Sequence, residues 1–304
     1  MKIYVAGHQG LVGSALTGKI ESSGKHHWFG KSRSELDLLD RKSVFEFIRS
    51  EAPDAILISA AKVGGIQAND SLPVEFLSEN LQIELNLIDG AHAAKTARVL
   101  FLGSSCVYPK LAPQPLKEEY LLSGPLEKTN ESYALAKIAG LKLIHAYRRE
   151  HGYSWISTMP TNIYGPRDNF DLSSSHVIPG LIRRFHEAKV GGAKTVSLWG
   201  SGAPRREFLH ADDLASACLF LIESYDDDVA INVGVGEDIA IKELAELIRH
   251  VVGFEGEIEW DSSKPDGTPR KLLDISRIES LGWKATISLE DGIRSTYEWF
   301  KANN

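Results

Sequence analysis

Cysteine and methionine are scarce in this chain, with two residues of each among 304. Cys106 and Cys218 lie far apart, and no Cys-x-x-Cys or His-Cys cluster has the spacing of a metal site. We therefore expect free thiols, no disulfide framework and no structural metal. Long hydrophobic runs are lacking too, since none approaches the roughly 20 residues that cross a bilayer. The first residues predict a strand and lack the apolar core of a signal peptide. We therefore expect a cytoplasmic protein without a membrane partner.

Basic residues are fewer than acidic ones. The chain has 34 Lys and Arg against 41 Asp and Glu, and its formal net charge of −7 argues against nucleic acid as a partner. With 43% hydrophobic and 25% charged residues, the composition is that of an ordinary globular protein with one large domain or two smaller ones. Any phosphate site must be local, and the pairs Arg183-Arg184 and Arg205-Arg206 are candidates for one.

Short apolar runs alternate with longer amphipathic segments in the first half of the chain. The runs at 2–7, 55–61, 99–105 and 154–160 predict strands, and the segments near 11–22, 41–50, 73–95 and 131–150 predict helices. This alternation predicts the α/β fold class, with a Rossmann-type doubly wound parallel sheet. Ligands of such sheets bind at the carboxyl ends of the strands.

The regularity loosens after residue 164. A helix is predicted near 177–188 and a strand near 195–199, whereas "AINVG" at 230–234 predicts a strand that returns to the main sheet. We predict an NADP(H)-binding Rossmann domain of residues 1–163 plus about 204–237. A second, smaller α/β substrate lobe would comprise about 164–203 plus 238–304.

A glycine-rich loop, "GHQGLVGSAL", follows the first predicted strand and opens into a helix. Glycine lets the backbone approach a pyrophosphate at the positive end of the helix, where amide N–H groups have no other partner. Glycines that serve only a tight turn are the alternative, which this strand-loop-helix context disfavours. The predicted cofactor loop comprises Gly7, His8, Gln9, Gly10, Leu11, Val12 and Gly13.

Basic residues stand where NAD-binding sheets usually place an acid for the ribose 2′-hydroxyl. The stretch "GKSRSELDL" brings Lys31 and Arg33 to the end of the predicted second strand. A guanidinium can pair with a 2′-phosphate, so NADPH/NADP+ is favoured over NADH. The alternative is that both side chains are solvated surface charges.

A tyrosine and a lysine stand four residues apart in the helical segment 131–150. This spacing puts Tyr133 and Lys137 on one face, one turn apart. We expect the ammonium to lower the pKa of the phenol and make it a proton donor to a ketone oxygen as hydride arrives. Such pairs also occur by chance, but this one follows a glycine loop and the "LGSS" of 102–105, in which Ser104 would hydrogen-bond the carbonyl.

Several longer blocks extend this pattern. They are "GHQGLVGSA", "AAKVGGI", "LGSSCVYPK", "ESYALAKIAGLKL", "PTNIYGPRDNF", "SHVIPGLIRRFHEA", "WGSGAPRREFLHADDLA" and "KPDGTPRKLLD". With these blocks the chain resembles the extended short-chain dehydrogenase/reductases and, within them, the GDP-L-fucose synthase family. The glycine loop and the Tyr-Lys pair are shared across the superfamily, whereas the blocks between 99 and 213 are specific to this family and its close relatives.

The resemblance implies two reactions at one site. Such an enzyme epimerises carbons 3 and 5 of GDP-4-keto-6-deoxy-D-mannose and reduces carbon 4 with NADPH, which yields GDP-L-fucose. Epimerisation needs a base, an acid and a stabilised enolate. By resemblance Cys106 and His176 carry the protons, in an order left open, while Ser104 and Tyr133 bind the oxygen. A cysteine is otherwise more often a small core hydrophobe, and we assign Cys218 to the core.

The resemblance also implies ligand contacts. For the cofactor these are Arg33, Leu102, Gly103, Ser104, Ser105, Lys137, Pro160, Thr161, Asn162, Ile163 and His176, in addition to the glycine loop. For the GDP-sugar they are Val177, Arg184, Trp199, Arg206, Asp266 and Lys271, whereas Arg183 and Arg205 are expected to be solvated. The chain departs from the family at Gln9, where relatives commonly carry an arginine for the 2′-phosphate. Arg33 is therefore left as the main determinant of an NADPH preference.

Two other functions stay open at this point. One is a GDP-L-colitose synthase type of enzyme, which inverts only carbon 5 before reduction. The other is a catalytically silent NADP(H)-binding sensor, against which the full set of expected catalytic residues argues. The helices near 73–95 and 131–150 resemble those of a four-helix dimer interface in the superfamily, so a homodimer is expected.

Overall fold

A computed structural model describes residues 1–263 and 266–304, so that Lys264 and Pro265 of the "KPDGTPRKLLD" block lie outside the described residues. The strands are β1 (Lys2–Ala6), β2 (His27–Phe29), β3 (Ala55–Ile58), β4 (Arg98–Leu102), β5 (Ile156–Pro160), β6 (Asn162–Tyr164), β7 (Thr195–Trp199), β8 (Arg205–Arg206), β9 (Phe208–His210), β10 (Ile231–Val233), β11 (Ile239–Ala240), β12 (Glu257–Asp261) and β13 (Arg270–Lys271). The α-helices are α1 (Leu11–Ser23), α2 (Arg41–Glu51), α3 (Ile66–Ser71), α4 (Pro73–Ala93), α5 (Glu131–His151), α6 (Val177–Val190), α7 (Ala211–Ser224), α8 (Ile241–Val252), α9 (Ser276–Ser280) and α10 (Leu289–Asn303). Short 3-10 helices are η1 (Ser105–Val107), η2 (Glu118–Tyr120) and η3 (Lys128–Asn130).

The central sheet has six strands in the order β10-β5-β4-β3-β1-β2. All its neighbouring strands pair in parallel. The chain moves outward from β1 to β2 and then returns to the other side of β1 to form β3, so the winding direction reverses between β1 and β3. The predicted doubly wound Rossmann-type sheet is confirmed, and the reversal marks the edge where such sheets bind ligands.

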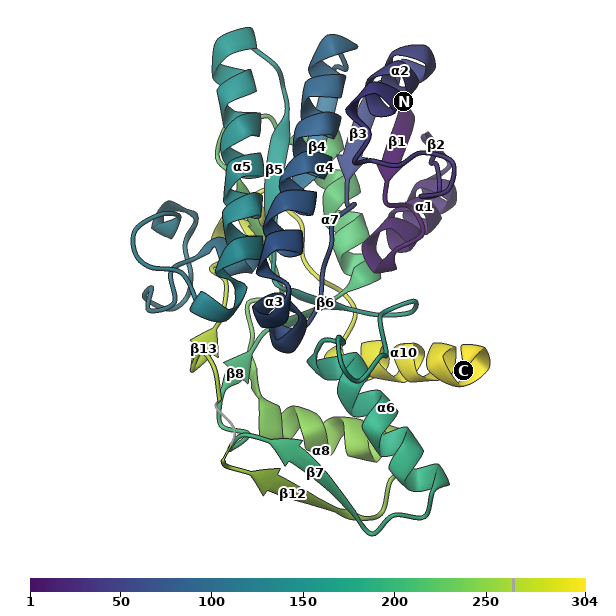
Figure 1. The fold of residues 1–304 in the computed structure, drawn as a ribbon, viewed down its shortest axis with the longest axis vertical. Helices are drawn as coiled ribbons and strands as arrows, with labels where there is room; N and C mark the ends of the chain where they lie inside the picture. Colours follow the sequence, from purple (N-terminus) through teal and green to yellow (C-terminus); the bar gives the residue numbers. More distant parts are fainter. Residues whose placement is uncertain (264–265) are drawn as a thin grey trace.

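Helices cover both faces of this sheet, which explains why its strands read as unbroken apolar runs. Every residue of β3 is buried, as expected for a parallel strand that is covered on both sides. Leu16 of α1 and Leu214 of α7 belong to the core on one face. Leu87 of α4 and Ile144 of α5 belong to the core on the other, and Figure 1 shows α4 and α5 side by side.

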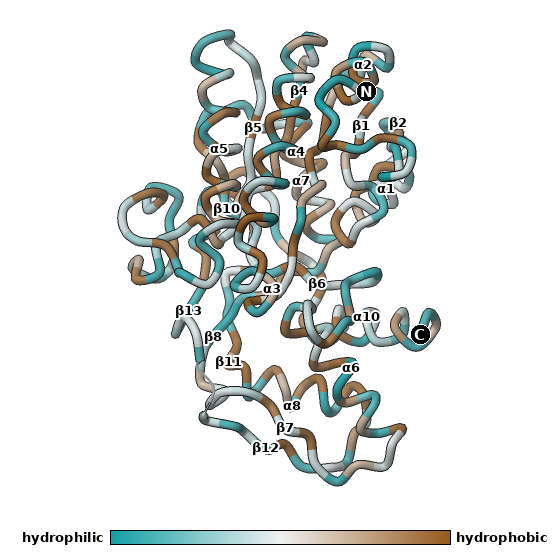
Figure 2. The backbone as a smooth tube through the Cα atoms, in the orientation of Figure 1, coloured by the Kyte–Doolittle hydropathy of each residue, from teal (hydrophilic) through white to brown (hydrophobic). Residues whose placement is uncertain are grey.

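A smaller lobe lies below the sheet in the view of Figure 1 and consists of α6, α8 and α10 with the parallel pair β7–β12. Its separate core includes Phe185, Leu198, Leu244 and Phe300. Short pairings connect the lobe to the sheet: β6 pairs with β9, and β8 lies between β11 and β13. In Figure 2 the central strands are mostly hydrophobic and the peripheral loops mostly hydrophilic.

The predicted helices of the first half agree with α1, α2, α4 and α5 to within a few residues. The prediction that 230–234 returns to the main sheet is also confirmed, because β10 pairs with β5. Among residues 1–263 and 266–304, no helix combines the length and the apolar character that a bilayer crossing requires.

Candidate active site

The glycine loop after β1 is folded so tightly that it leaves no room for a side chain at Gly7 or Gly13. Gly7 has a φ of 88°, a conformation that L side chains rarely adopt. A β-carbon added at Gly13 would lie 2.0 Å from the Gly7 carbonyl oxygen. Gly10 precedes α1 without a side-chain cap, and the first turn of the helix carries no acidic residue. The free amides and the positive helix end therefore fit a pyrophosphate.

Arg33 lies three residues after Gly30, where an added β-carbon would be 2.5 Å from Nδ1 of His8 in this loop. It follows β2 by four residues, is exposed, and takes part in no ion pair within the described residues, whereas Lys31 pairs with Glu35 at 3.3 Å. Gln9 is exposed as well and brings no charge. The Nδ1 atom of His8 is buried without a hydrogen-bond partner in the described part of the chain. The residues around the loop thus fit a phosphorylated dinucleotide with Arg33 as its outer contact.

The segment after β4 turns the chain into η1. The Gly103 amide donates to the Thr158 carbonyl at 2.8 Å, which holds the two strand ends together. The Ser104 hydroxyl then accepts a hydrogen bond from the Cys106 amide at 3.2 Å and caps η1. Ser105 is buried, and Leu102 is the last residue of β4. Ser104 and Cys106 are therefore held together at the carboxyl end of a central strand.

The thiol of Cys106 lies among hydrogen-bond donors and cations. The Asn130 side-chain amide donates to Sγ at 3.2 Å, and Lys271 Nζ lies 4.0 Å from the same atom. Arg206 is close enough to interact electrostatically with the thiol. These side chains surround the sulfur with hydrogen-bond donors and positive charge. Sequence reasoning placed Lys271 with the GDP-sugar and missed Asn130, whereas the structure brings both to the thiol.

Tyr133 and Lys137 project from α5 into the same region, but their electrostatics differ from the sequence-based expectation. Burial and the charges of Cys106 and Glu84 raise the pKa of Tyr133, and only a hydrogen bond with Ser104 works in the opposite direction. The expected lowering of the Tyr133 pKa by Lys137 is therefore wrong in this structure. Burial is the main cause of the rise, and the ammonium of Lys137 pairs with Glu84 of α4 at 3.1 Å.

His176 immediately precedes α6, as the sequence predicts, and its side chain does not cap the helix. Burial lowers the pKa of the imidazole, although the residue keeps contact with solvent. The loop before it is fixed by a 2.8 Å hydrogen bond from the Gly65 amide to the Ser174 carbonyl. α3, which starts at the next residue after Gly65, also packs on η3, which carries Asn130. The His176 loop and the partner of the Cys106 thiol therefore flank one short helix.

Each of the two arginine pairs, Arg183-Arg184 and Arg205-Arg206, has one member in an ion pair. Arg183 pairs with Glu187 at 2.7 Å, and Arg205 pairs with Asp238 at 2.7 Å. Arg184 and Arg206 have no carboxylate within ion-pair distance among residues 1–263 and 266–304. Partial burial lowers the pKa of Arg206, and a half-buried guanidinium without a carboxylate partner is suited to an anionic ligand.

Trp199 and Asp266 mark the outer end of the same lobe. Trp199 ends β7 and is 60% exposed. The Asp266 carboxylate accepts hydrogen bonds from the Ser201 amide and hydroxyl, each at 2.7 Å. Val177 is the first residue of α6. Trp199 thus offers an apolar surface near the loop that Asp266 holds, whereas Lys271 lies inward at the thiol.

The stretch after β5 is held by backbone contacts at the carboxyl end of the sheet. Pro160 ends β5, and the Thr161 amide donates to the Val233 carbonyl at 3.0 Å. The Asn162 side chain donates to the Glu207 carbonyl at 2.7 Å, and Ile163 packs against the core beneath.

No group of three or more His, Cys, Asp or Glu side chains within the described ranges could hold a metal ion.

Comparison with known proteins identifies the family. Residues 3–234 match the NAD dependent epimerase/dehydratase family. The chain belongs to this family.

Within the NAD dependent epimerase/dehydratase family, several curated proteins match nearly the full chain. GDP-L-fucose synthase 1 of Arabidopsis thaliana is 54% identical over 302 residues, which cover 99% of this chain and 94% of the relative. GDP-L-fucose synthase of Escherichia coli K12 is 51% identical and covers 99% and 97%. GDP-L-colitose synthase of Yersinia pseudotuberculosis is 39% identical and covers 99% and 98%.

Solved structures of this family agree in fold. A GDP-6-OMe-4-keto-L-xylo-heptose reductase from C. jejuni superposes with a TM-score of 0.95 at 36% identity and covers 100% of this chain and 98% of its own. A GDP-L-fucose synthetase from Naegleria fowleri bound to NADP has a TM-score of 0.92 at 28% identity and covers 99% and 94%. The fold that holds the glycine loop, the thiol and the Tyr-Lys pair is thus shared by reductases of GDP-sugars.

Proposed function

We propose that the chain is a bifunctional epimerase-reductase that converts GDP-4-keto-6-deoxy-D-mannose to GDP-L-fucose with NADPH. One observation carries the proposal: the Cys106 thiol, which reduction alone does not need, lies beside Ser104, Tyr133 and two cationic side chains. Relatives named GDP-L-fucose synthase at 51–54% identity over almost the full chain support the same activity.

The two steps share one oxygen-binding site. Ser104 and Tyr133 hold the oxygen at carbon 4 through hydrogen bonds, which stabilises the enolate formed when a neighbouring proton leaves. Cys106 and His176 remove and return the protons at carbons 3 and 5. NADPH, when bound, supplies a hydride to carbon 4. Tyr133 holds its proton at neutral pH, as an ordinary phenol does, and burial raises its pKa further; it donates that proton to the carbon 4 oxygen.

The cofactor is NADPH, bound by the glycine loop with Arg33 on the 2′-phosphate. The exposed guanidinium of Arg33, four residues after β2, supports this choice. Gln9 contributes no charge, so the preference depends on one side chain. The ratio of kcat/KM for NADPH to that for NADH measures it, and a ratio near one would contradict the assignment.

The GDP moiety binds between the smaller lobe, which carries Arg184 and Trp199, and the cofactor domain, which carries Arg206. Arg184 and Arg206 are the unpaired cations for the diphosphate, and Trp199 supplies an exposed ring for the base. We assign residues 1–163 and about 204–237 to the cofactor domain and the rest to the GDP-sugar lobe. A cytoplasmic location fits the free thiols of Cys106 and Cys218.

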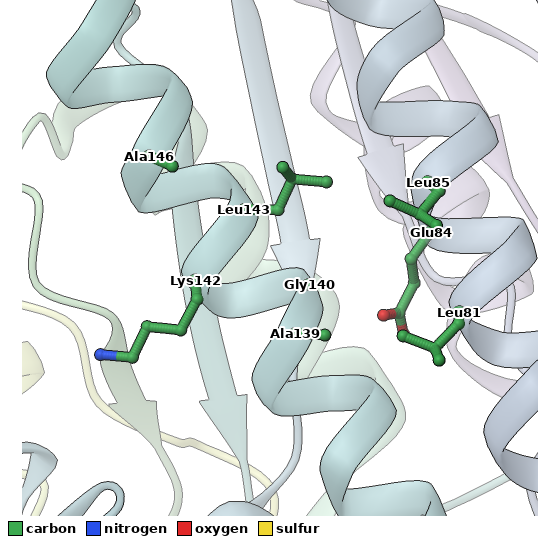
Figure 3. Close-up of a pocket in the computed structure, with 8 residues that line it drawn as sticks. All are labelled: Leu81, Glu84, Leu85, Ala139, Gly140, Lys142, Leu143 and Ala146. Carbon is green, nitrogen blue, oxygen red and sulfur yellow. The ribbon is translucent and has the colours of Figure 1, made fainter.

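The face formed by α4 and α5 supports a homodimer. A hollow of about 330 Å³ lies between these helices, lined by Leu81, Glu84, Leu85, Ala139, Gly140, Lys142, Leu143 and Ala146. Figure 3 shows leucines from both helices at its rim. Leu85 and Leu135 are 40% and 43% exposed, and contiguous exposed apolar groups of this kind mark interfaces.

The test is to incubate the protein with GDP-4-keto-6-deoxy-D-mannose and NADPH and to identify the product by NMR. We expect substrate-dependent loss of NADPH absorbance and the spectrum of GDP-L-fucose. Oxidation of NADPH without this ketosugar, or no oxidation with it, would contradict the proposal. GDP-L-colitose chemistry is disfavoured, because that relative is 39% identical against 54% and 51% for the fucose synthases of Arabidopsis thaliana and Escherichia coli K12.

A further inference from the structure

Glu207 is a buried carboxylate at the junction between the central sheet and the smaller lobe. It stands between β8 and β9 and has no solvent exposure. Its Oε1 atom accepts hydrogen bonds from the Val235 and Gly236 amides at 2.6 and 2.7 Å. Its Oε2 atom accepts one from the Leu273 amide at 2.9 Å. Burying a carboxylate is costly unless its oxygens are hydrogen-bonded, and these three amides provide the bonds.

The backbone around Glu207 leaves room for this side chain. A β-carbon added at Gly234, which directly follows β10, would lie 2.2 Å from Oε1 of Glu207. Any larger residue at position 234 would therefore displace the carboxylate. The main-chain carbonyl of Glu207 accepts hydrogen bonds from the Asn162 side chain at 2.7 Å and from the Thr161 hydroxyl at 3.2 Å. One buried residue thus joins three segments that are far apart in the sequence.

The amide of Leu273 belongs to the segment that carries Lys271. β13 pairs in parallel with β8, with Lys271 opposite Arg206, and Figure 1 shows the two strands side by side. This pairing ends at Lys271, and the hydrogen bond from Leu273 to Glu207 follows two residues later. The side chain of Lys271 brings Nζ to 4.0 Å from Sγ of Cys106. A two-residue strand and the bond that follows it therefore locate the ammonium on this side.

The loop between η1 and η2 holds the same segment from its other side. The Leu272 amide donates to the Gln114 side chain at 2.9 Å. The Leu116 amide donates to the Leu272 carbonyl at 2.7 Å, and the Asp274 amide donates to the Leu116 carbonyl at 2.8 Å. Residues 272 and 274 thus bond to this loop, whereas the Leu273 amide between them needs an acceptor on the opposite side. The buried carboxylate is that acceptor.

We propose that Glu207 is a positioning residue that fixes the segment of Lys271, so that the ammonium lies at the Cys106 thiol during epimerisation. The inference deepens the proposed function and rests on its assignment of Cys106 to proton transfer. An ammonium beside a group that exchanges protons with the substrate stabilises negative charge that develops in the transition state. Glu207 is not itself a catalytic residue, because its buried oxygens are occupied by the three backbone amides.

The first test measures amide hydrogen exchange by NMR in the NADP+-bound protein without substrate. E207Q keeps the size of the side chain but replaces one acceptor oxygen by an NH₂ group, so we expect the Leu273 amide to exchange at least about 10-fold faster. Asp213→Asn is the matched control, because this buried carboxylate accepts from the amides of residues 286 and 287 instead. Gly234→Ala displaces the Glu207 carboxylate without removing it and serves as a second variant. Unchanged protection of Leu273 in both variants would overturn the inference.

The second test is a double-mutant cycle with Lys271, read as incorporation of solvent deuterium into GDP-4-keto-6-deoxy-D-mannose with NADP+ bound. We expect E207Q to slow incorporation by roughly 10- to 100-fold, Lys271→Met to slow it at least as much, and the double variant to be no slower than Lys271→Met. Asp213→Asn should retain the wild-type rate. An equal loss from E207Q in the Lys271→Met background would overturn the inference. If wild type incorporates no deuterium, the proposed function fails, while the exchange of Leu273 still decides whether Glu207 holds this segment.

Discussion

At the residue scale, the second reaction depends on the thiol of Cys106. Asn130 and Lys271 contact this sulfur from two other segments of the chain. We predict that Cys106→Ser loses epimerisation by at least about 100-fold, because a hydroxyl is a far weaker acid than a thiol at neutral pH. The measurement is the exchange of solvent deuterium into the ketosugar, with NADPH binding recorded alongside as evidence of an intact fold.

Two variants serve as controls for this result. Tyr133→Phe removes the proton donor for reduction and leaves the thiol in place, so deuterium exchange should continue while NADPH consumption stops. Cys218→Ala changes the other thiol, which is fully buried in the core, and should lower the melting temperature without affecting exchange. Normal exchange in Cys106→Ser would show that another group moves the protons.

A second residue-scale prediction concerns Asp168, in the loop between β6 and α6. One of its carboxylate oxygens is buried without a partner in the described part of the chain, and burial raises the pKa from 3.8 to about 7. The folded state thus holds a proton that the unfolded chain releases, so the free energy of unfolding falls as pH rises from about 4 to about 7. Asp168→Asn should remove this pH dependence. The free energy of unfolding of the variant minus that of wild type should therefore be larger at pH 8 than at pH 4, by about 2 to 4 kcal/mol.

Denaturation of the Asp168→Asn variant at several pH values measures the effect. Asp171→Asn is a suitable control, because hydrogen bonds from Ser173 lower the pKa of that exposed carboxyl. Its substitution should change stability in the opposite sense, with a loss at neutral pH. Parallel curves for wild type and Asp168→Asn would contradict the prediction.

Spacing predicted Tyr133 and Lys137, and the resemblance implied Cys106, but sequence reasoning missed Glu84 and Asn130, which contact Lys137 and the thiol. Asn130 was missed because its contact with the thiol crosses 24 positions of the chain. Glu84 carried a signal: it falls four residues after Asn80 and three before Leu87, on the buried face of α4. A carboxylate at such a position requires a buried cation.

At the scale of elements, the junction of β1 and α1 determines cofactor binding. We predict that Gly13→Ala abolishes measurable NADPH binding and destabilises the fold by at least about 2 kcal/mol, since the added carbon overlaps the Gly7 carbonyl. Gly18→Ala in the same helix meets no atom within 4 Å and should stabilise the protein by about 0.5 to 1 kcal/mol. Thermal melts and NADPH titrations of both variants check the pair, and equal effects would contradict it.

The long elements were predictable and the short ones were not. Buried parallel strands such as β3 are continuous apolar runs, and helices such as α4 show their period over many turns. β8, β11 and β13 have two residues each, which is too short for any period. Their pairing depends on tertiary contacts, so the route by which Lys271 reaches Cys106 was not visible in the sequence.

At the scale of the whole molecule, the apolar face of α4 and α5 is the expected contact between two copies. We predict that Leu85→Asp yields a monomer, because it would bury a charge without a partner in the interface. Leu111→Asp is the control, since Leu111 is 84% exposed and belongs to the segment between η1 and η2, outside both helices. Light scattering distinguishes the two, and a wild-type protein that is already monomeric would contradict the dimer.

The central claim is that one site both epimerises and reduces the sugar. The most direct measurement is proton NMR of the product formed in deuterium oxide from GDP-4-keto-6-deoxy-D-mannose and unlabelled NADPH. We predict deuterium at carbons 3 and 5 and protium from the cofactor at carbon 4 of GDP-L-fucose. A reduced product with protium at carbons 3 and 5, or with deuterium at carbon 5 alone, would contradict the account.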